Sequence, residues 1–214
     1  ANELTDAFLV AFRIPNFFRR LFAEGAFSQA FLPILAESKA NQSDEEVQLI
    51  INHIATKLLS ILMIITLIAI VIAPIIILLF AWGFYFKADA TQFNLASDIL
   101  RITFPYLLLI SLTALSGSIL NTYDNFIIPA FTPVLLNVSL LLSAVFLSKY
   151  LSTPIMALCW GGLIGGMIQL GFQIPVLRKR KRLPKLQFGQ HKALSIHRKR
   201  MLPALFGVSV SQIN

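Results

Sequence analysis

The chain has 214 residues, of which 57% are hydrophobic and only 13% are charged, and its mean hydropathy is +0.75. Because soluble globular domains carry about 25% charged residues, this composition excludes that class and indicates an integral membrane protein. The single cysteine, Cys159, excludes disulfides within the chain. We expect this cysteine to be a small buried packing residue.

Four stretches contain no charged residue, and each is longer than the roughly 20 residues that a helix needs to cross about 30 Å of hydrocarbon. They are residues 58–86, 102–123, 125–148 and 150–177. Runs such as LLSILMIITLIAIVIAPIIILLF do not alternate between apolar and polar residues, as the strands of a membrane barrel do. The predicted fold class is therefore all-α, a polytopic membrane helical bundle in a single transmembrane domain.

The first predicted helix covers residues 4–36 and is unusually polar, with a bend expected at Pro15. On a helical wheel one side gathers a polar stripe that consists of Asn2, Asp6, Arg13, Asn16, Arg20 and Glu24. Such a stripe favours contact with protein or water rather than lipid. Arg19 lies off the stripe, unless the bend at Pro15 rotates it back.

Charged residues inside this helix need a reason, because an arginine that faces lipid costs about 2.5–3.5 kcal/mol. Snorkelling explains Arg13 adequately, and an ion pair of Arg20 with Glu24 is a structural alternative. A hydrated cavity is the interpretation that we favour for Arg19 and Arg20. Guanidinium groups bind phosphate bidentately at all accessible pH values, so such a pair is suited to holding a pyrophosphate.

The second predicted helix covers residues 47–80, and Ser43 lies just before it, with Glu46 three residues later. This spacing predicts a capping box, in which the Ser43 side chain accepts from the Glu46 amide and the neighbouring acids face the positive end of the helix. The segment 43–46 holds the only acidic cluster of the chain. Capping is a better explanation for it than metal binding.

Three further helices are predicted at residues 97–121, 129–149 and 154–177. The last contains the sequence GGLIGG, in which Gly161/Gly165 and Gly162/Gly166 have the spacing of small residues that pack helices closely. A phosphate loop is disfavoured there, because neither a strand nor a Gly-Lys-Ser/Thr ending accompanies the glycines.

A basic loop follows at residues 178–200 and holds ten of the eighteen Lys and Arg residues. Because it lies between membrane segments, the positive-inside rule places it in the cytoplasm without any nucleic acid partner. Contact with anionic lipid headgroups is the alternative that remains open. Residues 201–214 begin another helix, and we expect the chain to be a piece of a longer transporter-like protein.

Four segments of the chain resemble the MurJ (MviN) family, the lipid II flippases of bacterial peptidoglycan synthesis. They are TDAFLVAFRIPNFFRRLFAEGAFSQAFLPILAE (5–37), ITFPYLLLISL (102–112), ILNTYDNFIIPAFTPVLLN (119–137) and LPALFGVSVSQIN (202–214). The resemblance implies the fold of the multidrug/oligosaccharidyl-lipid/polysaccharide (MOP) exporter superfamily, with two pseudo-symmetric lobes around a central cavity. The chain would supply about helices 2–6 and the start of helix 7, most of the amino-terminal lobe.

The resemblance also implies the site residues. Asp6 and Arg19 match functional positions of the family, and Asn16, Arg20 and Glu24 lie in the same motif. It places Arg19 in the cavity, and we follow it over the ideal wheel. No catalytic residue, metal ligand or cofactor is expected, and an ion gradient or the membrane potential is the expected source of energy.

The implied function is a flippase that moves the undecaprenyl-pyrophosphate-linked peptidoglycan precursor, lipid II, across the bacterial cytoplasmic membrane by alternating access. The expected partners are lipid II, membrane lipids and the remaining helices of the protein. The alternatives are a related exporter of another lipid-linked glycan and a drug/cation antiporter, for which buried carboxylates are expected. A membrane enzyme is disfavoured by the scattered His53, His191 and His197, and a scaffold leaves Arg19 and Arg20 without a reason.

Overall fold

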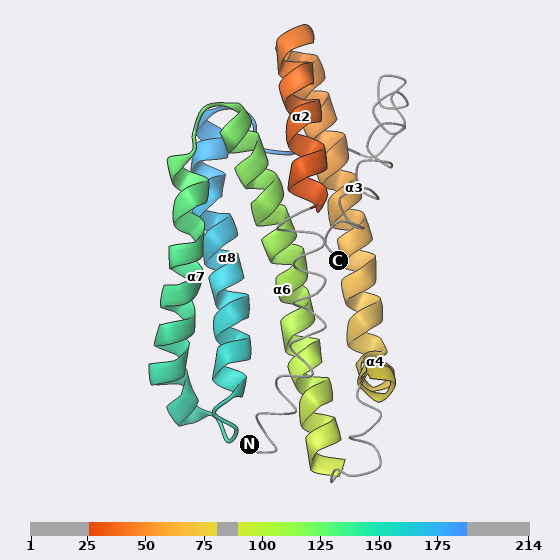
Figure 1. The fold of residues 1–214 in the computed structure, drawn as a ribbon, viewed down its shortest axis with the longest axis vertical. Helices are drawn as coiled ribbons and strands as arrows, with labels where there is room; N and C mark the ends of the chain where they lie inside the picture. The colour runs from red at the N-terminus through yellow and green to blue at the C-terminus, as the bar shows by residue number, and fades with distance from the viewer. Residues whose placement is uncertain (1–25, 81–89, 188–214) are drawn as a thin grey trace.

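The computed structural model describes residues 26–80 and 90–187. Its helices are α2 (Ala26–Asn41), α3 (Asp44–Val71), α4 (Ala73–Phe80), α6 (Ala90–Thr122), α7 (Ile127–Phe146), the 3-10 helix η2 (Leu147–Tyr150) and α8 (Met156–Lys179). Figure 1 shows α3, α6, α7 and α8 side by side along the long axis, with the shorter α2 beside α3 at one end. Four of the described helices are long and apolar enough to cross a membrane. The all-α, polytopic membrane fold is therefore confirmed.

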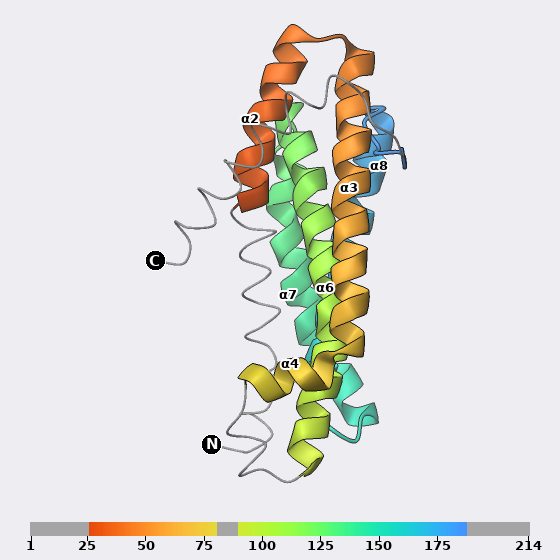
Figure 2. The same ribbon diagram turned by 90° about the vertical axis from the view of Figure 1, so that its right-hand side faces the viewer.

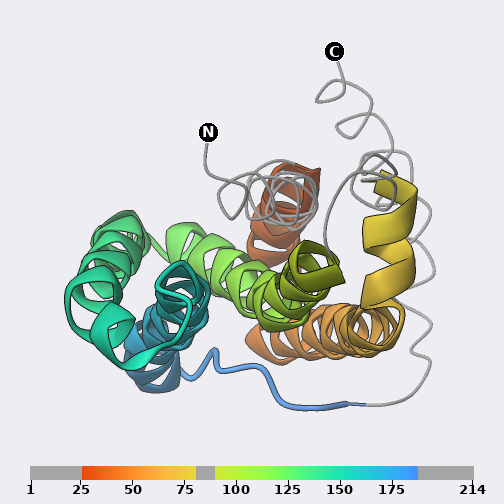
Figure 3. The same cartoon turned by 90° about the horizontal axis from the view of Figure 1, so that it is seen from below.

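The connections alternate between the two ends of the bundle. The α2–α3 and α6–α7 connections lie at the same end as the carboxyl end of α8, as Figure 1 shows. We call this the basic end, because it carries Lys39, Arg178, Lys179, Arg180 and Arg182. Seen along the bundle in Figure 3, α2 lies on one side of α6, whereas the chain that follows α8 runs along the other side toward α3.

The capping box predicted before α3 is confirmed. The Ser43 hydroxyl accepts from the backbone N–H of Glu46 at 3.4 Å, and the Glu46 carboxylate accepts from the backbone N–H of Ser43 at 3.0 Å. Asp44, Glu45 and Glu46 occupy the first turn, where carboxylates interact favourably with the helix dipole. The capping box and the first-turn acids thus fix where α3 begins.

The single helix expected over residues 47–80 is wrong at its end. α3 ends at Val71, and α4 turns away across the bundle, as Figure 2 shows. The reason is Pro74, which has no N–H to donate to the carbonyl of Ile70. The Arg101 guanidinium of α6 takes this role, since its Nε donates to the Ile70 carbonyl at 3.4 Å.

Other helix ends also differ from the predicted ones. α2 continues to Asn41, beyond the expected end at residue 36, and α6 begins at Ala90 instead of residue 97. Charged side chains are compatible with a helix that leaves the hydrocarbon. In α6, for example, Asp98 and Arg101 are three residues apart and form an ion pair at 3.0 Å, so each charge has a partner on the same helix.

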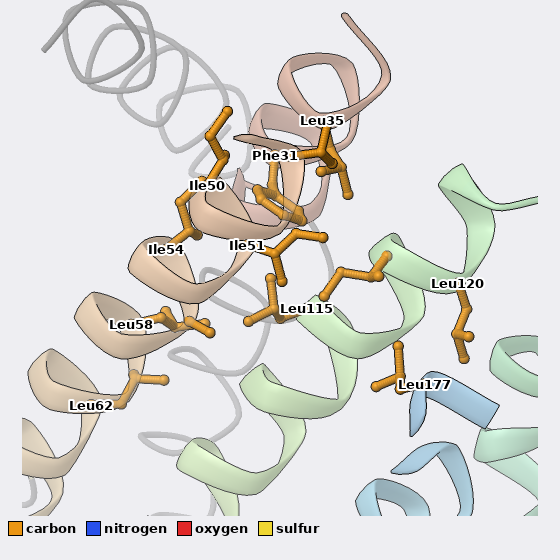
Figure 4. Close-up of a cluster of buried hydrophobic side chains, with 13 residues drawn as sticks. Phe31, Leu35, Ile50, Ile51, Ile54, Leu58, Leu62, Leu115, Leu120 and Leu177 are labelled. Atoms are coloured by element: carbon orange, nitrogen blue, oxygen red, sulfur yellow. The ribbon is translucent and has the colours of Figure 1, made fainter. Parts of the chain in front are cut away.

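Two apolar clusters fill the bundle. The first joins α2, α3, α6 and α8 near the basic end, and Figure 4 shows Phe31 and Leu35 of α2 packed on Ile51 of α3. The second lies at the opposite end, where α3, α4 and α6 meet, and it includes Cys159 of α8. The expectation that this cysteine is a buried packing residue is confirmed.

α7 has an inverted pattern of burial. The buried residues of this helix are the hydroxyl-bearing Thr132, Ser139 and Ser143, whereas most of its large aliphatic and aromatic side chains are exposed. In water this arrangement would expose apolar surface without compensation, but hydrocarbon removes that cost and leaves close helix packing as the driving force. One face of α7 therefore belongs against lipid.

The glycines of α8 provide the packing surface opposite those hydroxyls. A Cβ on Gly161 would lie 2.7 Å from the Cβ of Ser143, and one on Gly165 would lie 2.8 Å from a methyl of Leu136. The Ser139 hydroxyl donates to the Gly161 carbonyl at 2.8 Å. The predicted packing role is confirmed for Gly161, Gly165 and also Gly166, which faces α6, but Gly162 faces open space.

Candidate functional site

The five residues predicted to engage the substrate, Asp6, Asn16, Arg19, Arg20 and Glu24, lie outside the described residues, as does the basic loop beyond Gln187. Their roles stay predictions. The described part of the chain contains two other polar regions, one at the basic end and one between α6, α7 and α8. Most basic residues of the first region were identified from the sequence but their partners on α3 and α6 were not, and the second region was not identified at all.

Two cations lie over the same tyrosine ring at the basic end. The Lys39 ammonium is 4.8 Å and the Arg182 guanidinium 4.7 Å from the centre of the Tyr123 ring. Lys39 also donates to the Thr122 carbonyl at 2.7 Å and lies 3.6 Å from an Asp124 carboxylate oxygen. The quadrupole of the ring attracts both cations and thus partly offsets the repulsion between them.

Arg182 joins α8 to the start of α3. Its side chain is largely buried and forms an ion pair with the Asp44 carboxylate, and Nη1 donates to the Asp44 carbonyl at 2.9 Å. Burial raises the pKa of the Tyr123 hydroxyl, which the Arg182 charge opposes and the Asp44 charge reinforces. The tyrosine therefore stays neutral, and the cluster keeps its cations without a phenolate partner.

Two matching helix ends bring these groups together. Asp124 after α6 and Lys181 after α8 both have left-handed backbone conformations, with φ of 59° and 57°. The N–H of Arg182 donates to the Leu177 carbonyl and that of Lys181 to the Arg178 carbonyl, the pattern of a Schellman motif. This turn reverses the chain and directs Arg182 toward α3.

Beyond this turn, residues 180–187, which we call the strap, are fastened along α3 by a ladder of hydrogen bonds. Gln48 Nε2 donates to the Leu183 carbonyl at 3.2 Å, and Asn52 Oδ1 accepts from the Lys185 N–H at 2.9 Å. Next, Thr56 Oγ1 accepts from the Gln187 N–H at 2.9 Å.

The spacing of this ladder has a simple geometric basis. Its α3 members are four residues apart and so rise about 6 Å per step on one face of the helix. Alternate residues of an extended chain advance by about 6.6 Å, so the two repeats match over the two steps that join the three hydrogen-bonded pairs. The signal in the sequence was a polar residue at every fourth position, Gln48, Asn52 and Thr56, leading into an apolar run.

Below the strap lies an apolar cavity of about 260 Å³ between α3, α6 and α8. Leu183, Pro184 and Leu186 of the strap cover one side of it, and Leu112, Leu115 and Leu170 lie among the helix residues that line it. The strap therefore combines hydrogen bonds to α3 with an apolar lid over the groove.

A second cavity, of about 340 Å³, lies where α2, α6, α7 and α8 meet. Its polar wall includes Gln169 and Gln173 of α8, which are only 2% and 1% exposed. The side-chain carbonyl oxygens of both glutamines lack a hydrogen-bond partner in the described part of the chain. A buried unpaired acceptor costs about 1–3 kcal/mol, so two in one cavity call for an explanation. We call this cavity the glutamine pocket.

Comparison with known proteins adds an independent line of evidence. A model of the family "Lipid II flippase MurJ" matches residues 1–214. A lipid II flippase MurJ from Burkholderia cenocepacia is 42% identical over 219 residues, which cover 100% of this chain and 42% of that protein. A probable lipid II flippase MurJ from Vibrio cholerae is 44% identical over 220 residues and is covered to the same extent.

The fold is similar to that of a solved structure described as lipid II flippase MurJ in an inward closed conformation. The TM-score is 0.77 at 30% sequence identity, and the similarity covers 100% of this chain and 43% of the other. The chain thus spans a little over two fifths of the length of the proteins that it matches. Because the family model matches every residue, the chain belongs to the MurJ family of lipid II flippases.

Proposed function

We propose that the whole protein is a lipid II flippase that moves the undecaprenyl-pyrophosphate-linked disaccharide-pentapeptide from the inner to the outer leaflet of the cytoplasmic membrane by alternating access. The observation that carries this proposal is the family match over residues 1–214, supported by relatives at 42% and 44% identity. The chain is about 42% of those relatives, so the activity belongs to the complete protein and not to these helices alone.

In this proposal Arg19 and Arg20 hold the pyrophosphate of the substrate, with Asn16 and Glu24 beside them. Asp6 lies near the outer rim of the cavity as a gate or as an ion-pair partner of an arginine elsewhere in the protein. The protein is a transporter and not an enzyme, it uses no cofactor, and an ion gradient or the membrane potential drives it.

The proposed orientation places the basic end in the cytoplasm. Cationic side chains of the described residues gather at this end, namely Lys39, Arg178, Lys179, Arg180, Lys181, Arg182 and Lys185. The positive-inside rule favours that placement. Cysteines introduced at Gln187 or Lys192 should therefore resist an impermeant label applied to intact cells, and labelling from outside would contradict the topology.

A drug/cation antiporter of the same superfamily is less well supported. Such a transporter is expected to present buried carboxylates to its substrate, whereas the described residues that line the glutamine pocket include no Asp or Glu. The predicted cavity helix is net basic, which suits an anionic substrate.

The central test is a flipping assay with lipid II in vesicles, normalised to the amount of folded protein. We expect Arg19→Lys to lose much of the activity although the charge is kept, because an ammonium cannot reproduce two parallel hydrogen bonds. Arg19→Ala should lose more. Each charged hydrogen bond is worth about 1.5–3 kcal/mol, so losing two reduces substrate engagement by about two orders of magnitude or more.

The matched control is Arg13→Lys, which makes the same substitution on the same predicted helix at a position that snorkelling explains. We expect its normalised flipping rate to stay near that of the parent. Equal rates for the parent, Arg19→Lys and Arg19→Ala would exclude substrate contact at Arg19. Failure of the parent to flip lipid II would overturn the function itself.

A further inference from the structure

The glutamine pocket has a feature that packing does not explain. Gln169 and Gln173 are one helical turn apart and so share a face of α8, and both are almost completely buried. Within the described residues, neither side-chain carbonyl oxygen has a hydrogen-bond partner. Apolar side chains of similar size would fill these positions without leaving unpaired acceptors.

The orientation of the Gln169 amide is fixed by α7. Its Nε2 donates to the Thr132 carbonyl at 2.7 Å. Rotating the amide by half a turn would bring two oxygen acceptors together, so Oε1 is held on the other side. Gln169 is among the residues that line the cavity, and its Oε1 is buried there without a hydrogen-bond partner in the described part of the chain.

Space near the second acceptor is created by a missing side chain on α6. A Cβ on Gly117 would lie 4.0 Å from Gln173 Oε1 and 3.4 Å from the Cβ of Pro129. An alanine at this position would therefore fit, but its methyl group would occupy room beside the acceptor. The glycine leaves that room free.

The hydroxyl groups on the pocket wall also contribute acceptors. Thr113 and Ser118 donate to carbonyls of their own helix at 2.9 Å, and Thr132 donates to the Pro129 carbonyl at 2.8 Å. The Pro129 carbonyl is available to Thr132 because Pro133 has no N–H to donate to it. With their hydrogens used in this way, the three hydroxyls can only accept from a ligand.

These properties define the chemical class of the ligand. Among the described residues that line the pocket there is no Asp, Glu, Lys or Arg, and an anion would be repelled by a wall rich in acceptors. The volume of about 340 Å³ far exceeds that of a single ion or water and lies at the lower end of the range for ligand cavities. An uncharged group that carries several O–H or N–H donors, of the size of one sugar ring, fits both observations.

We propose that the glutamine pocket binds an uncharged, donor-bearing part of the substrate headgroup, with Gln169 and Gln173 accepting from its hydroxyl or amide groups. This inference rests on the proposed function, because lipid II carries both sugar hydroxyls and peptide amides beyond its pyrophosphate. The pocket thereby binds the uncharged part of the headgroup, while Arg19 and Arg20 bind the charged pyrophosphate.

The test measures binding of three probes to the whole protein in detergent, namely lipid II, the same lipid without its peptide, and undecaprenyl pyrophosphate. The variants are Gln173→Leu, which removes one acceptor, and Gly117→Ala, which fills space beside it. We expect each to weaken lipid II binding about 3–10-fold, the range for one or two lost neutral hydrogen bonds, and to leave undecaprenyl pyrophosphate binding unchanged.

Comparison of the three probes distinguishes sugar hydroxyls from peptide amides as the donors in the pocket. If sugar hydroxyls occupy the pocket, the variants weaken binding of the peptide-free lipid as well as lipid II, whereas a peptide ligand confines the loss to lipid II. Gly171→Ala is the matched control for Gly117→Ala, because a Cβ there meets nothing within 4 Å. It should bind all three probes as the parent does.

Thermal unfolding distinguishes this role from a structural one. Replacing an unpaired buried acceptor by leucine should leave the unfolding temperature unchanged or raise it, while binding falls. Undiminished lipid II binding in both variants, or equal losses for all three probes, would overturn the inference and leave the flippase proposal intact. If Gln173→Leu fails to fold, Gly117→Ala decides by the same criterion. Failure of the parent to bind lipid II would overturn both proposals.

Discussion

α8 makes two contacts of opposite character. Inside the bundle α8 packs closely on α7, because Gly161 and Gly165 have no side chain and let the two backbones approach. Beyond its carboxyl end, the strap is held on α3 by polar side chains, with Asn52 at the centre. Within the hydrocarbon, close packing is the available source of affinity between helices, whereas at the membrane surface hydrogen bonds fix a segment that has no regular structure of its own.

The largest expected effect is on the strap, from Asn52→Leu. Asn52 accepts from Gln48 and from the Lys185 N–H, and it donates to Gln187. Leucine removes all three hydrogen bonds and leaves a partly buried N–H unpaired, which should lower the free energy of unfolding by about 2–4 kcal/mol. Thermal unfolding of the whole protein in detergent and hydrogen exchange at Lys185 measure this.

The control for this substitution is Asn94→Leu, which alters an exposed asparagine of α6. It should change neither the unfolding temperature nor exchange in the strap. If Asn52→Leu left exchange at Lys185 and Gln187 as slow as in the parent, the ladder would not be what holds the strap.

The α7–α8 contact should respond to a single methyl group. In Gly161→Ala the new Cβ would lie 2.7 Å from the Cβ and Oγ of Ser143, so the helices must separate. We expect a loss of about 1–3 kcal/mol in the free energy of unfolding, with strap exchange unchanged. Gly162→Ala places the same methyl group in open space and should be neutral. Equal effects of the two substitutions would exclude close packing as the role of Gly161.

A smaller effect is expected at the junction of the two contacts. Arg182→Met removes the ion pair with Asp44 and one of the two cations on the Tyr123 ring. Because Asp44 is largely exposed and its loss of a partner is screened, the expected destabilisation is about 1–2 kcal/mol. Arg180→Met, at an exposed position two residues earlier, should have no measurable effect on the unfolding temperature.

The smallest effect concerns the turn that separates the two contacts. Lys181 has φ of 57°, a conformation that glycine adopts without a steric penalty. Lys181→Gly should therefore raise the free energy of unfolding by about 0.3–1 kcal/mol. The same substitution at Lys179, which is still helical, should not raise it. A fall in stability for Lys181→Gly would mean that the lysine side chain stabilises the fold by more than its left-handed backbone conformation destabilises it.

Local chemistry in the sequence determined much about this protein. Composition alone established that this is a membrane protein, because uncharged apolar runs longer than about 20 residues are typical of membrane-spanning helices. The capping box at Ser43 was predictable since its two partners are three residues apart. The break near Pro74 was not predicted, although Pro74 has no N–H to donate, and the sequence did not show that Arg101 would bind the freed carbonyl of Ile70.

Only the tertiary structure decided which polar side chains act together. Asn52 meets Lys185 across 133 residues, and Gln169 meets Thr132 across 37. Spacing along one helix shows that such residues share a face, but not which segment covers that face. The same holds for Gly161 and Gly162, which are adjacent in sequence and differ only in whether α7 lies opposite. Contacts over long sequence separations depend on how the helices are arranged, and periodicity within one helix carries no information about its neighbours.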